Sequence, residues 1–182
     1  MTCIVGLIDK GKIYIGGDSA GTSNNRVVIR KDKKVFIRDD KFIMGFTTSF
    51  RMGQLLMCDD RFSIRDQNTG EDDFHYMINA FIPAIQKLFA DGGFLVKDNE
   101  EISGGTFLVG YNKRLYKIEA NFQVGESIDN YDACGCGEEY ALGSLFTTQK
   151  TELTSEQRIL IALESASEFS TSVAPPFNIL NL

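Results

Sequence analysis

Runs of consecutive apolar residues, rather than alternating ones, are the feature that most constrains the fold of this chain. Residues 3–8 read Cys-Ile-Val-Gly-Leu-Ile, and residues 42–47 read Phe-Ile-Met-Gly-Phe-Thr. A strand with one face in water would place a polar residue at every second position, so these runs indicate strands that are buried on both faces. A sheet that packs against a second sheet on one side and under helices on the other would produce this pattern.

Turn and cap signals divide the chain into strands and helices. Strands are expected at residues 3–8, 13–17, 34–38, 42–47, 105–111, 114–119 and 131–134. Helices are expected at about 50–58, from Asp73 to Gly92-Gly93, from Glu138, and after the capping box at 154–157. Pro83 should kink the second helix, and Pro175-Pro176 should leave an extended tail.

The order of these elements is strands, two helices, strands, two helices. It predicts one α+β domain over residues 1–182, built as a four-layer αββα sandwich of two antiparallel sheets flanked by helices. The polar, Asp-rich segment 59–73 is expected to be a long exposed loop.

Composition excludes several classes of function. The chain has 182 residues and a net charge of −6, which disfavours a nucleic-acid groove or an anionic membrane surface as partner. No signal peptide or membrane span is visible, and four irregularly spaced cysteines favour free thiols in a reducing cytoplasm. Cys134-x-Cys136 has no second ligand pair and His75 is the only histidine, so neither a metal nor a cofactor is expected.

Thr2 is the strongest candidate for chemistry. Removal of Met1 would give Thr2 a free α-amine, which can act as the base for its own hydroxyl and makes a histidine unnecessary. Asp18 and Lys34 lie sixteen and thirty-two residues downstream. Each residue also has an ordinary interpretation: a strand start for Thr2, a turn aspartate after two glycines for Asp18, and a surface lysine in a basic run for Lys34.

The chain resembles a known family in these segments. Three segments are similar to proteasome β subunits, and more so to the bacterial HslV-type peptidase rings. They read Met-Thr-Cys-Ile-Val, Gly-Lys-Ile-Tyr-Ile-Gly-Gly-Asp-Ser and Lys-Lys-Val-Phe-Ile. In that family the catalytic threonine, aspartate and lysine have the spacings found here. The similarity extends to residues 40–46, 135–141 and 162–164. It implies the fold of the N-terminal-nucleophile (Ntn) hydrolases, a threonine peptidase, a homo-oligomeric ring, unfolded protein or peptide substrates, and a separate ATPase partner.

The resemblance also assigns roles. It makes Thr2 the nucleophile, Lys34 the group that supports the hydroxyl and the developing negative charge, and Asp18 the partner of Lys34. A backbone N–H near Thr48 or Ser49, where relatives have glycines, would hold the oxyanion. The family has three further site residues, a serine, an aspartate and a second serine, and these positions fall on Cys136, Glu168 and Thr171. The positions that line the family's substrate pocket fall on Ala20, Gly21, Phe46 and Ser49.

Two alternatives remain open at the level of sequence. The changes at Thr48, Ser49 and Cys136, together with the requirement for Met1 removal, fit a catalytically weak or inactive ring subunit that serves as a scaffold. The same nucleophile would also serve an Ntn amidase that acts on a small molecule, because a fold does not specify a substrate.

Overall fold

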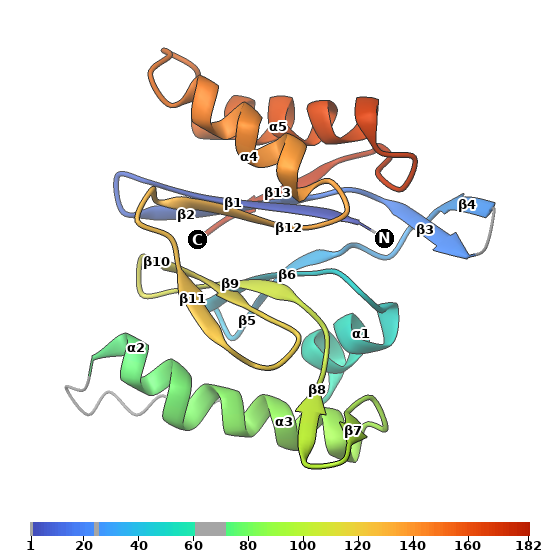
Figure 1. Cartoon of the computed structure of the whole chain (residues 1–182). Helices are drawn as coiled ribbons and strands as arrows, with labels where there is room; N and C mark the ends of the chain where they lie inside the picture. Colours follow the sequence, from blue (N-terminus) through green and yellow to red (C-terminus); the bar gives the residue numbers. More distant parts are fainter. Residues whose placement is uncertain (1, 24–25, 61–71) are drawn as a thin grey trace.

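Two antiparallel sheets lie face to face at the centre of the molecule (Figure 1). The computed structural model describes residues 2–23, 26–60 and 72–182. The first sheet has the order β12-β1-β2-β13, with β1 (Cys3–Asp9), β2 (Lys12–Gly17), β12 (Tyr131–Gly135) and β13 (Asn178–Asn181). The second has the order β11-β10-β9-β6-β5, with β5 (Val35–Arg38), β6 (Phe42–Phe46), β9 (Phe107–Tyr111), β10 (Arg114–Ile118) and β11 (Val124–Glu126).

Helices cover the outer face of each sheet, which completes four layers (Figure 1). Helices α4 (Glu138–Thr148) and α5 (Ser155–Phe169) pack on the first sheet. Helices α1 (Phe50–Cys58), α2 (Asp73–Tyr76) and α3 (Ile82–Asp91), with the π-helical turn η1 (Met77–Phe81), pack on the second. The predicted αββα sandwich is confirmed. Within the described ranges no helix is both long and apolar enough to cross a membrane.

Strand β1 shows why its sequence is apolar at consecutive positions. Ile4 faces the second sheet and joins the core between the sheets, whereas Val5 and Leu7 point the other way, into the core beneath α4 and α5. All three side chains are at most 2% exposed. Full burial of such a side chain contributes roughly 1.5–3 kcal/mol, so both faces of β1 stabilise the sandwich.

The local signals for helix ends are confirmed. Helix α5 begins with a complete capping box, in which the Thr154 hydroxyl accepts from the Gln157 N–H and the Gln157 side chain accepts from the Thr154 N–H. Helix α3 ends before Gly92. Pro83 does not break the long helix. The chain passes through the π-turn η1 just before it, where the Ile82 N–H bonds to the Met77 carbonyl.

Other elements differ from the sequence-based expectation. The tail after Pro176 is not merely extended, because β13 pairs with β2 and extends the first sheet. Two hairpins were not predicted: β3 (Ala20–Ser23) with β4 (Arg26–Ile29), and β7 (Val96–Asp98) with β8 (Glu101–Ser103). Most of the predicted loop at 59–73, residues 61–71, lies outside the described residues, and α2 begins at Asp73.

Candidate active site

The three residues at spacings of sixteen and thirty-two come together at one end of the two sheets. Thr2 directly precedes β1, Asp18 directly follows β2, and Lys34 directly precedes β5. Strands β1 and β2 are antiparallel neighbours, with Ile4 opposite Gly17, so the start of one lies beside the end of the other. The three side chains are buried: Thr2 is 4% exposed, and Asp18 and Lys34 are 1% exposed.

The Lys34 amine is the centre of this group. Its Nζ donates to Thr2 Oγ1 at 2.8 Å and to Asp18 Oδ1 at 2.8 Å. Burial lowers the pKa of Lys34 from its ordinary value of 10.5, and the neighbouring Asp18 carboxylate opposes that shift. The threonine hydroxyl therefore lies against a buried cationic donor that gives up its proton more readily than a surface lysine.

Asp18 holds Lys34 in place and is itself held by the backbone. Its Oδ1 also accepts from the Cys3 N–H at 3.0 Å, and its Oδ2 accepts from the N–H groups of Ala20 at 2.9 Å and Ala174 at 3.4 Å. These donors come from β1, from β3 and from the segment that follows α5. They compensate the carboxylate for the water lost on burial.

Gly135 makes room for Thr2, a role that the sequence interpretation did not assign. Its φ is +102°, a left-handed conformation that favours glycine, and a Cβ at this position would lie 2.2 Å from the Thr2 carbonyl oxygen. The same Cβ would be 3.2 Å from Thr47 Cγ2, so Thr2 and Thr47 both approach Gly135 closely. The available signal was the Gly135-Cys136-Gly137 segment, which carried part of the family resemblance.

The turn after β6 distinguishes the two candidate oxyanion donors. The Ser49 N–H is already used, because it donates to the Thr47 carbonyl at 2.6 Å. Thr48 has a φ of +58°, and among the hydrogen bonds of the described residues none uses its N–H. The Phe46 N–H bonds to the Lys34 carbonyl at 3.1 Å, which keeps this turn beside the site. Thr48 is thus the candidate whose backbone donor is available.

The three other predicted catalytic positions are all exposed. Cys136 follows Gly135 directly and its thiol is exposed, and Glu168 and Thr171 are exposed as well. The Lys34 amine makes its two side-chain bonds with Thr2 and Asp18, not with any of these three. From the segment after α5, the Ala174 N–H is the group that reaches the site, and a lone backbone donor leaves no signal in a sequence.

The two buried cysteines beside the site, Cys3 and Cys134, are not rival nucleophiles. Burial is the main cause that raises the pKa of both Cys3 and Cys134 well above the ordinary value, so these thiols stay protonated near neutral pH. Among the described residues, no three His, Cys, Asp or Glu side chains are grouped to hold a metal ion. Within that part of the chain, Thr2 is the nucleophile that the geometry favours.

An aromatic and basic wall stands next to Lys34. The Phe50 ring centroid is 5.7 Å from Lys34 Nζ, and the Arg30 guanidinium covers the same ring at 3.9 Å. Asp32 fixes Arg30 through two hydrogen bonds of 2.8 and 2.7 Å. Of the predicted pocket positions, Gly21 adjoins this wall, since a Cβ there would lie 2.6 Å from Arg30 Cδ. Ala20 and Phe46 are buried behind it.

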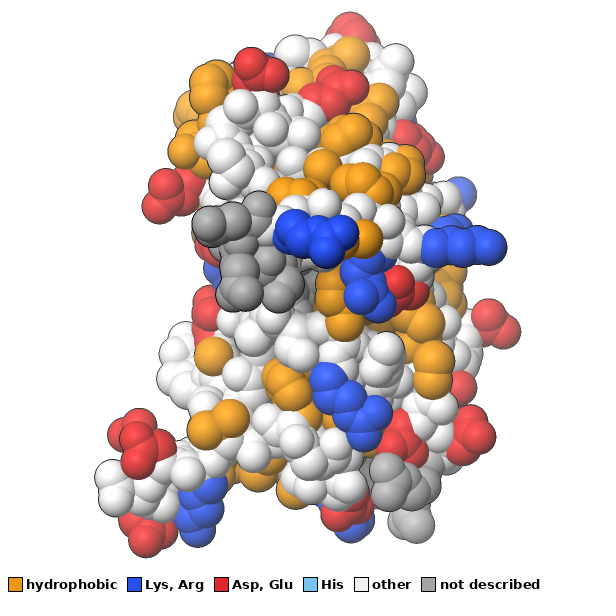
Figure 2. Space-filling view, turned by 90° about the vertical axis from the view of Figure 1, so that its right-hand side faces the viewer, with side chains coloured by type: hydrophobic (Ala, Val, Ile, Leu, Met, Phe, Trp, Pro, Cys, Tyr) orange, Lys and Arg blue, Asp and Glu red, His pale blue; other side chains and the backbone are white. Residues whose placement is uncertain are grey.

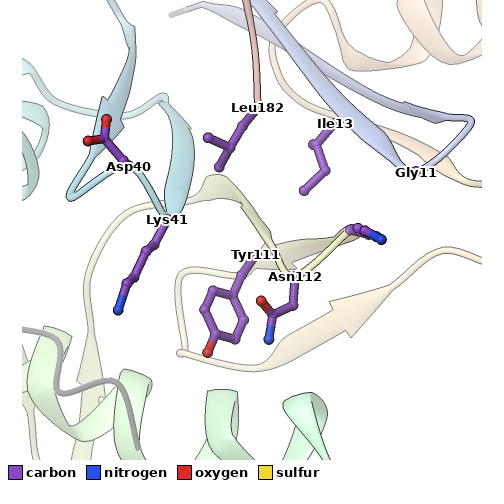
Figure 3. A pocket seen from close by; sticks show the side chains of 8 residues that line it. Gly11, Ile13, Asp40, Lys41, Tyr111, Asn112 and Leu182 are labelled. Carbon is purple, nitrogen blue, oxygen red and sulfur yellow. The ribbon is translucent and has the colours of Figure 1, made fainter. Parts of the chain in front are cut away.

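The two ends of the sandwich differ in character. The face toward which the β3–β4 hairpin projects exposes Lys and Arg side chains through its middle, among hydrophobic ones (Figure 2). At the opposite end of the strands, a cavity of about 300 Å³ lies between the hairpin turns (Figure 3). Its lining includes Ile13, Tyr111 and Leu182 but none of the Thr2 group, so it is separate from the candidate active site.

Comparison with known proteins identifies the fold. No protein-family model matches the chain, and no curated protein sequence matches it significantly. Among solved structures, Thiobacillus denitrificans BPH in complex with epoxomicin is similar with a TM-score of 0.81 and 18% identity, covering 100% of this chain and 98% of that one. Eukaryotic HslV from Trypanosoma brucei gives 0.73 and 15%, covering 100% and 99%. An Anbu (Gly-1) mutant from Hyphomicrobium sp. strain MC1 gives 0.70 and 15%, covering 98% and 80%.

These matches span essentially the whole chain at identities of 15–18%. The chain therefore has the fold of the proteasome-like, HslV-type Ntn hydrolases, as the sequence resemblance predicted. At such identities the likeness defines the fold, whereas the chemistry has to be argued from this chain's own residues.

Proposed function

We propose that the protein is an N-terminal-threonine peptidase with Thr2 as its nucleophile. The observation that supports this most strongly is the buried row of Thr2 Oγ1, Lys34 Nζ and Asp18 Oδ1, with 2.8 Å between neighbouring atoms. A buried lysine–aspartate pair carries a large desolvation cost and adds little stability over apolar packing. Its position against a threonine hydroxyl favours a catalytic role for the pair.

The proposed acylation step needs Thr2 to be the first residue. Its α-amine, with a reference pKa of roughly 7.7–8.0, takes the hydroxyl proton while Oγ1 attacks the carbonyl carbon of the scissile amide. The Lys34 ammonium stabilises the hydroxyl oxygen as it loses its proton. The negative charge that develops on the carbonyl oxygen is placed against the Thr48 N–H.

Collapse of the tetrahedral intermediate breaks the C–N bond. The proton held by the α-amine passes to the leaving amine, and the acyl group remains on Thr2 as an ester. A water then gives its proton to the α-amine and attacks the ester carbon. The bond between that carbon and Thr2 Oγ1 breaks, the α-amine returns the proton to Oγ1, and the carboxylic acid is released. Each step uses groups of this chain and water.

The proposal also covers the substrate and the assembly of the protein. We expect unfolded proteins or peptides as substrates, a homo-oligomeric ring that encloses the sites, a separate ATPase that supplies unfolded chains, and a cytoplasmic location. The family resemblance supports these expectations. The exposed apolar strand β4, where Val27, Val28 and Ile29 are each about half exposed, supports the oligomeric assembly. The assignment of Cys136, Glu168 and Thr171 to the catalytic machinery stays a prediction.

Two features favour a second candidate, a ring subunit with little or no activity. A threonine occupies the oxyanion turn at positive φ, and a thiol stands where relatives have a serine hydroxyl. An Ntn amidase for small substrates is a third candidate, and substrate profiling separates it from a peptidase.

The test compares hydrolysis of fluorogenic peptides, unfolded casein and simple amides by the wild type and three variants. Thr2→Ala and Lys34→Met should each lower kcat by a factor on the order of 10³ or more. Lys33→Met is the matched control, because Lys33 is exposed beside Lys34, and it should retain activity. Covalent labelling of Thr2 by epoxomicin, located by peptide mass mapping, would support the same site. Equal activity of Thr2→Ala and wild type would refute the proposal.

A further inference from the structure

Thr48 combines two features that rarely occur together. It is β-branched, and its φ of +58° lies in the left-handed region that β-branched residues avoid. The hydrogen bond from the Ser49 N–H to the Thr47 carbonyl spans two residues, so Thr48 is the centre of a γ-turn with positive φ, the rarer and more strained form. Glycine would adopt this conformation without strain.

The turn sets the direction of the Thr48 N–H. In a trans peptide the N–H points opposite to the carbonyl of the preceding residue. The Thr47 carbonyl points into the turn toward Ser49, so the Thr48 N–H points out of it. Thr47 and Thr2 both lie against Gly135, so the turn is next to the nucleophile.

A closed circuit of hydrogen bonds ties the turn to the backbone of Thr106. The Thr106 N–H donates to Thr48 Oγ1 at 3.2 Å, and Thr47 Oγ1 donates to the Thr106 carbonyl at 2.7 Å. The two hydroxyl oxygens are 3.1 Å apart. The Thr47 hydroxyl has one proton, which the Thr106 carbonyl receives, so the Thr48 hydroxyl donates to Thr47. The circuit thus starts at the Thr106 N–H and returns to the Thr106 carbonyl.

We propose that Thr48 is a positioning residue whose hydroxyl, through this circuit with Thr47 and the Thr106 backbone, holds the γ-turn that directs the Thr48 N–H toward the oxyanion. A circuit in which each bond polarises the next is stronger than isolated bonds, which suits it to holding a strained turn. The side chain thereby provides the fixed turn geometry that glycine would allow but not enforce. This inference rests on the proposed peptidase function.

The experiment compares four substitutions by kcat, by KM and by hydrogen exchange at the Thr106 amide. Thr48→Val keeps the β-branched shape and removes the hydroxyl. The turn keeps its strain and loses the hydrogen bonds of Thr48 to Thr47 and Thr106, while the Thr47 N–H and hydroxyl still donate to the Thr106 carbonyl. We expect its kcat to fall at least tenfold, toward the roughly 10²–10³-fold loss typical of a missing oxyanion donor, with KM within about threefold. The Thr106 amide should exchange faster because its acceptor is gone.

The other three variants serve as controls. Thr48→Ser keeps the hydroxyl and should stay within about threefold of wild type in kcat. Thr48→Gly removes the backbone strain together with the hydrogen bonds of the Thr48 hydroxyl, and should therefore be more active than Thr48→Val. Thr106→Val changes a side chain outside the circuit, which uses only that residue's backbone, so its kcat should match wild type.

Outcomes for the circuit and for the proposed function are separable. Wild-type kcat and wild-type Thr106 exchange in Thr48→Val would overturn the circuit, as would equal losses of kcat in Thr48→Val and Thr106→Val. Activity that survives in Thr2→Ala would instead overturn the peptidase proposal. In that event, faster Thr106 exchange in Thr48→Val still supports the circuit, and unchanged exchange overturns it.

Discussion

Replacement of Asp18 by asparagine should destabilise the protein strongly although it changes only one functional group. Asp18 accepts from Lys34 Nζ and the Cys3 N–H through Oδ1, and from the Ala20 and Ala174 N–H groups through Oδ2. An asparagine amide in either orientation turns two protons toward two of these donors. It also leaves the Lys34 ammonium, which is 1% exposed, without its counter-charge.

The expected magnitude follows from the buried pair. Loss of one member of such a pair costs about 3–5 kcal/mol. For a chain of this size that corresponds to a fall in Tm of roughly 6–20 °C. Urea unfolding and thermal scans of wild type and Asp18→Asn, at equal protein concentration because assembly contributes to stability, measure the difference.

The deficit of Asp18→Asn should depend on pH in a defined direction. Burial already lowers the pKa of Lys34, and removal of Asp18 takes away the main cause that opposes this shift. The folded variant therefore releases the Lys34 proton at a lower pH than the unfolded chain, so its stability rises with pH above neutrality. A loss below about 1 kcal/mol at pH 7, or a deficit that grows as pH rises toward 10, would refute the reasoning.

Three further predictions concern the surroundings of Thr2. Gly135→Ala should destabilise the fold and abolish activity, because the new Cβ would lie 2.2 Å from the Thr2 carbonyl oxygen and residue 135 has a φ of +102°. Urea unfolding and peptide hydrolysis measure the two effects. Wild-type values in both assays would contradict the prediction. Cys136→Ser should raise kcat, since a hydroxyl is the better hydrogen-bonding group; unchanged kcat would place residue 136 outside the chemistry. The pH profile of kcat/KM should be bell-shaped. It rises as the α-amine loses its proton and falls as Lys34 loses its own below the ordinary 10.5. A flat alkaline side up to pH 10.5 would count against a charged Lys34.

Much of the fold was predictable because local signals agree with the global pattern. The double burial of β1, the capping box of α5 and the glycine stop after α3 each follow from short stretches of sequence. Strand β4 was not found, since Val27, Val28 and Ile29 are exposed on a projecting hairpin and do not follow the rule that apolar runs are buried. Strand β13 depends on a long-range pairing with β2.

The same contrast holds for the site. Thr2, Asp18 and Lys34 were predictable because their types and spacings match those of the family that the chain resembles, and the fold brings the three together at the ends of strands. The other features of the site act through the backbone. Gly135 allows the chain to approach Thr2 closely, the Ala174 N–H donates to Asp18, and the Thr106 N–H donates to the Thr48 hydroxyl. Such roles depend on chain geometry, and residue types alone do not reveal them.

The mass of the N-terminal peptide, from protein expressed without any N-terminal tag, tests the central claim most directly. The proposed mechanism uses the α-amine of Thr2 as the base, so it predicts a chain that begins at Thr2. A chain that still begins at Met1 has this nitrogen in a peptide bond, where it cannot accept a proton, and that result would contradict the mechanism.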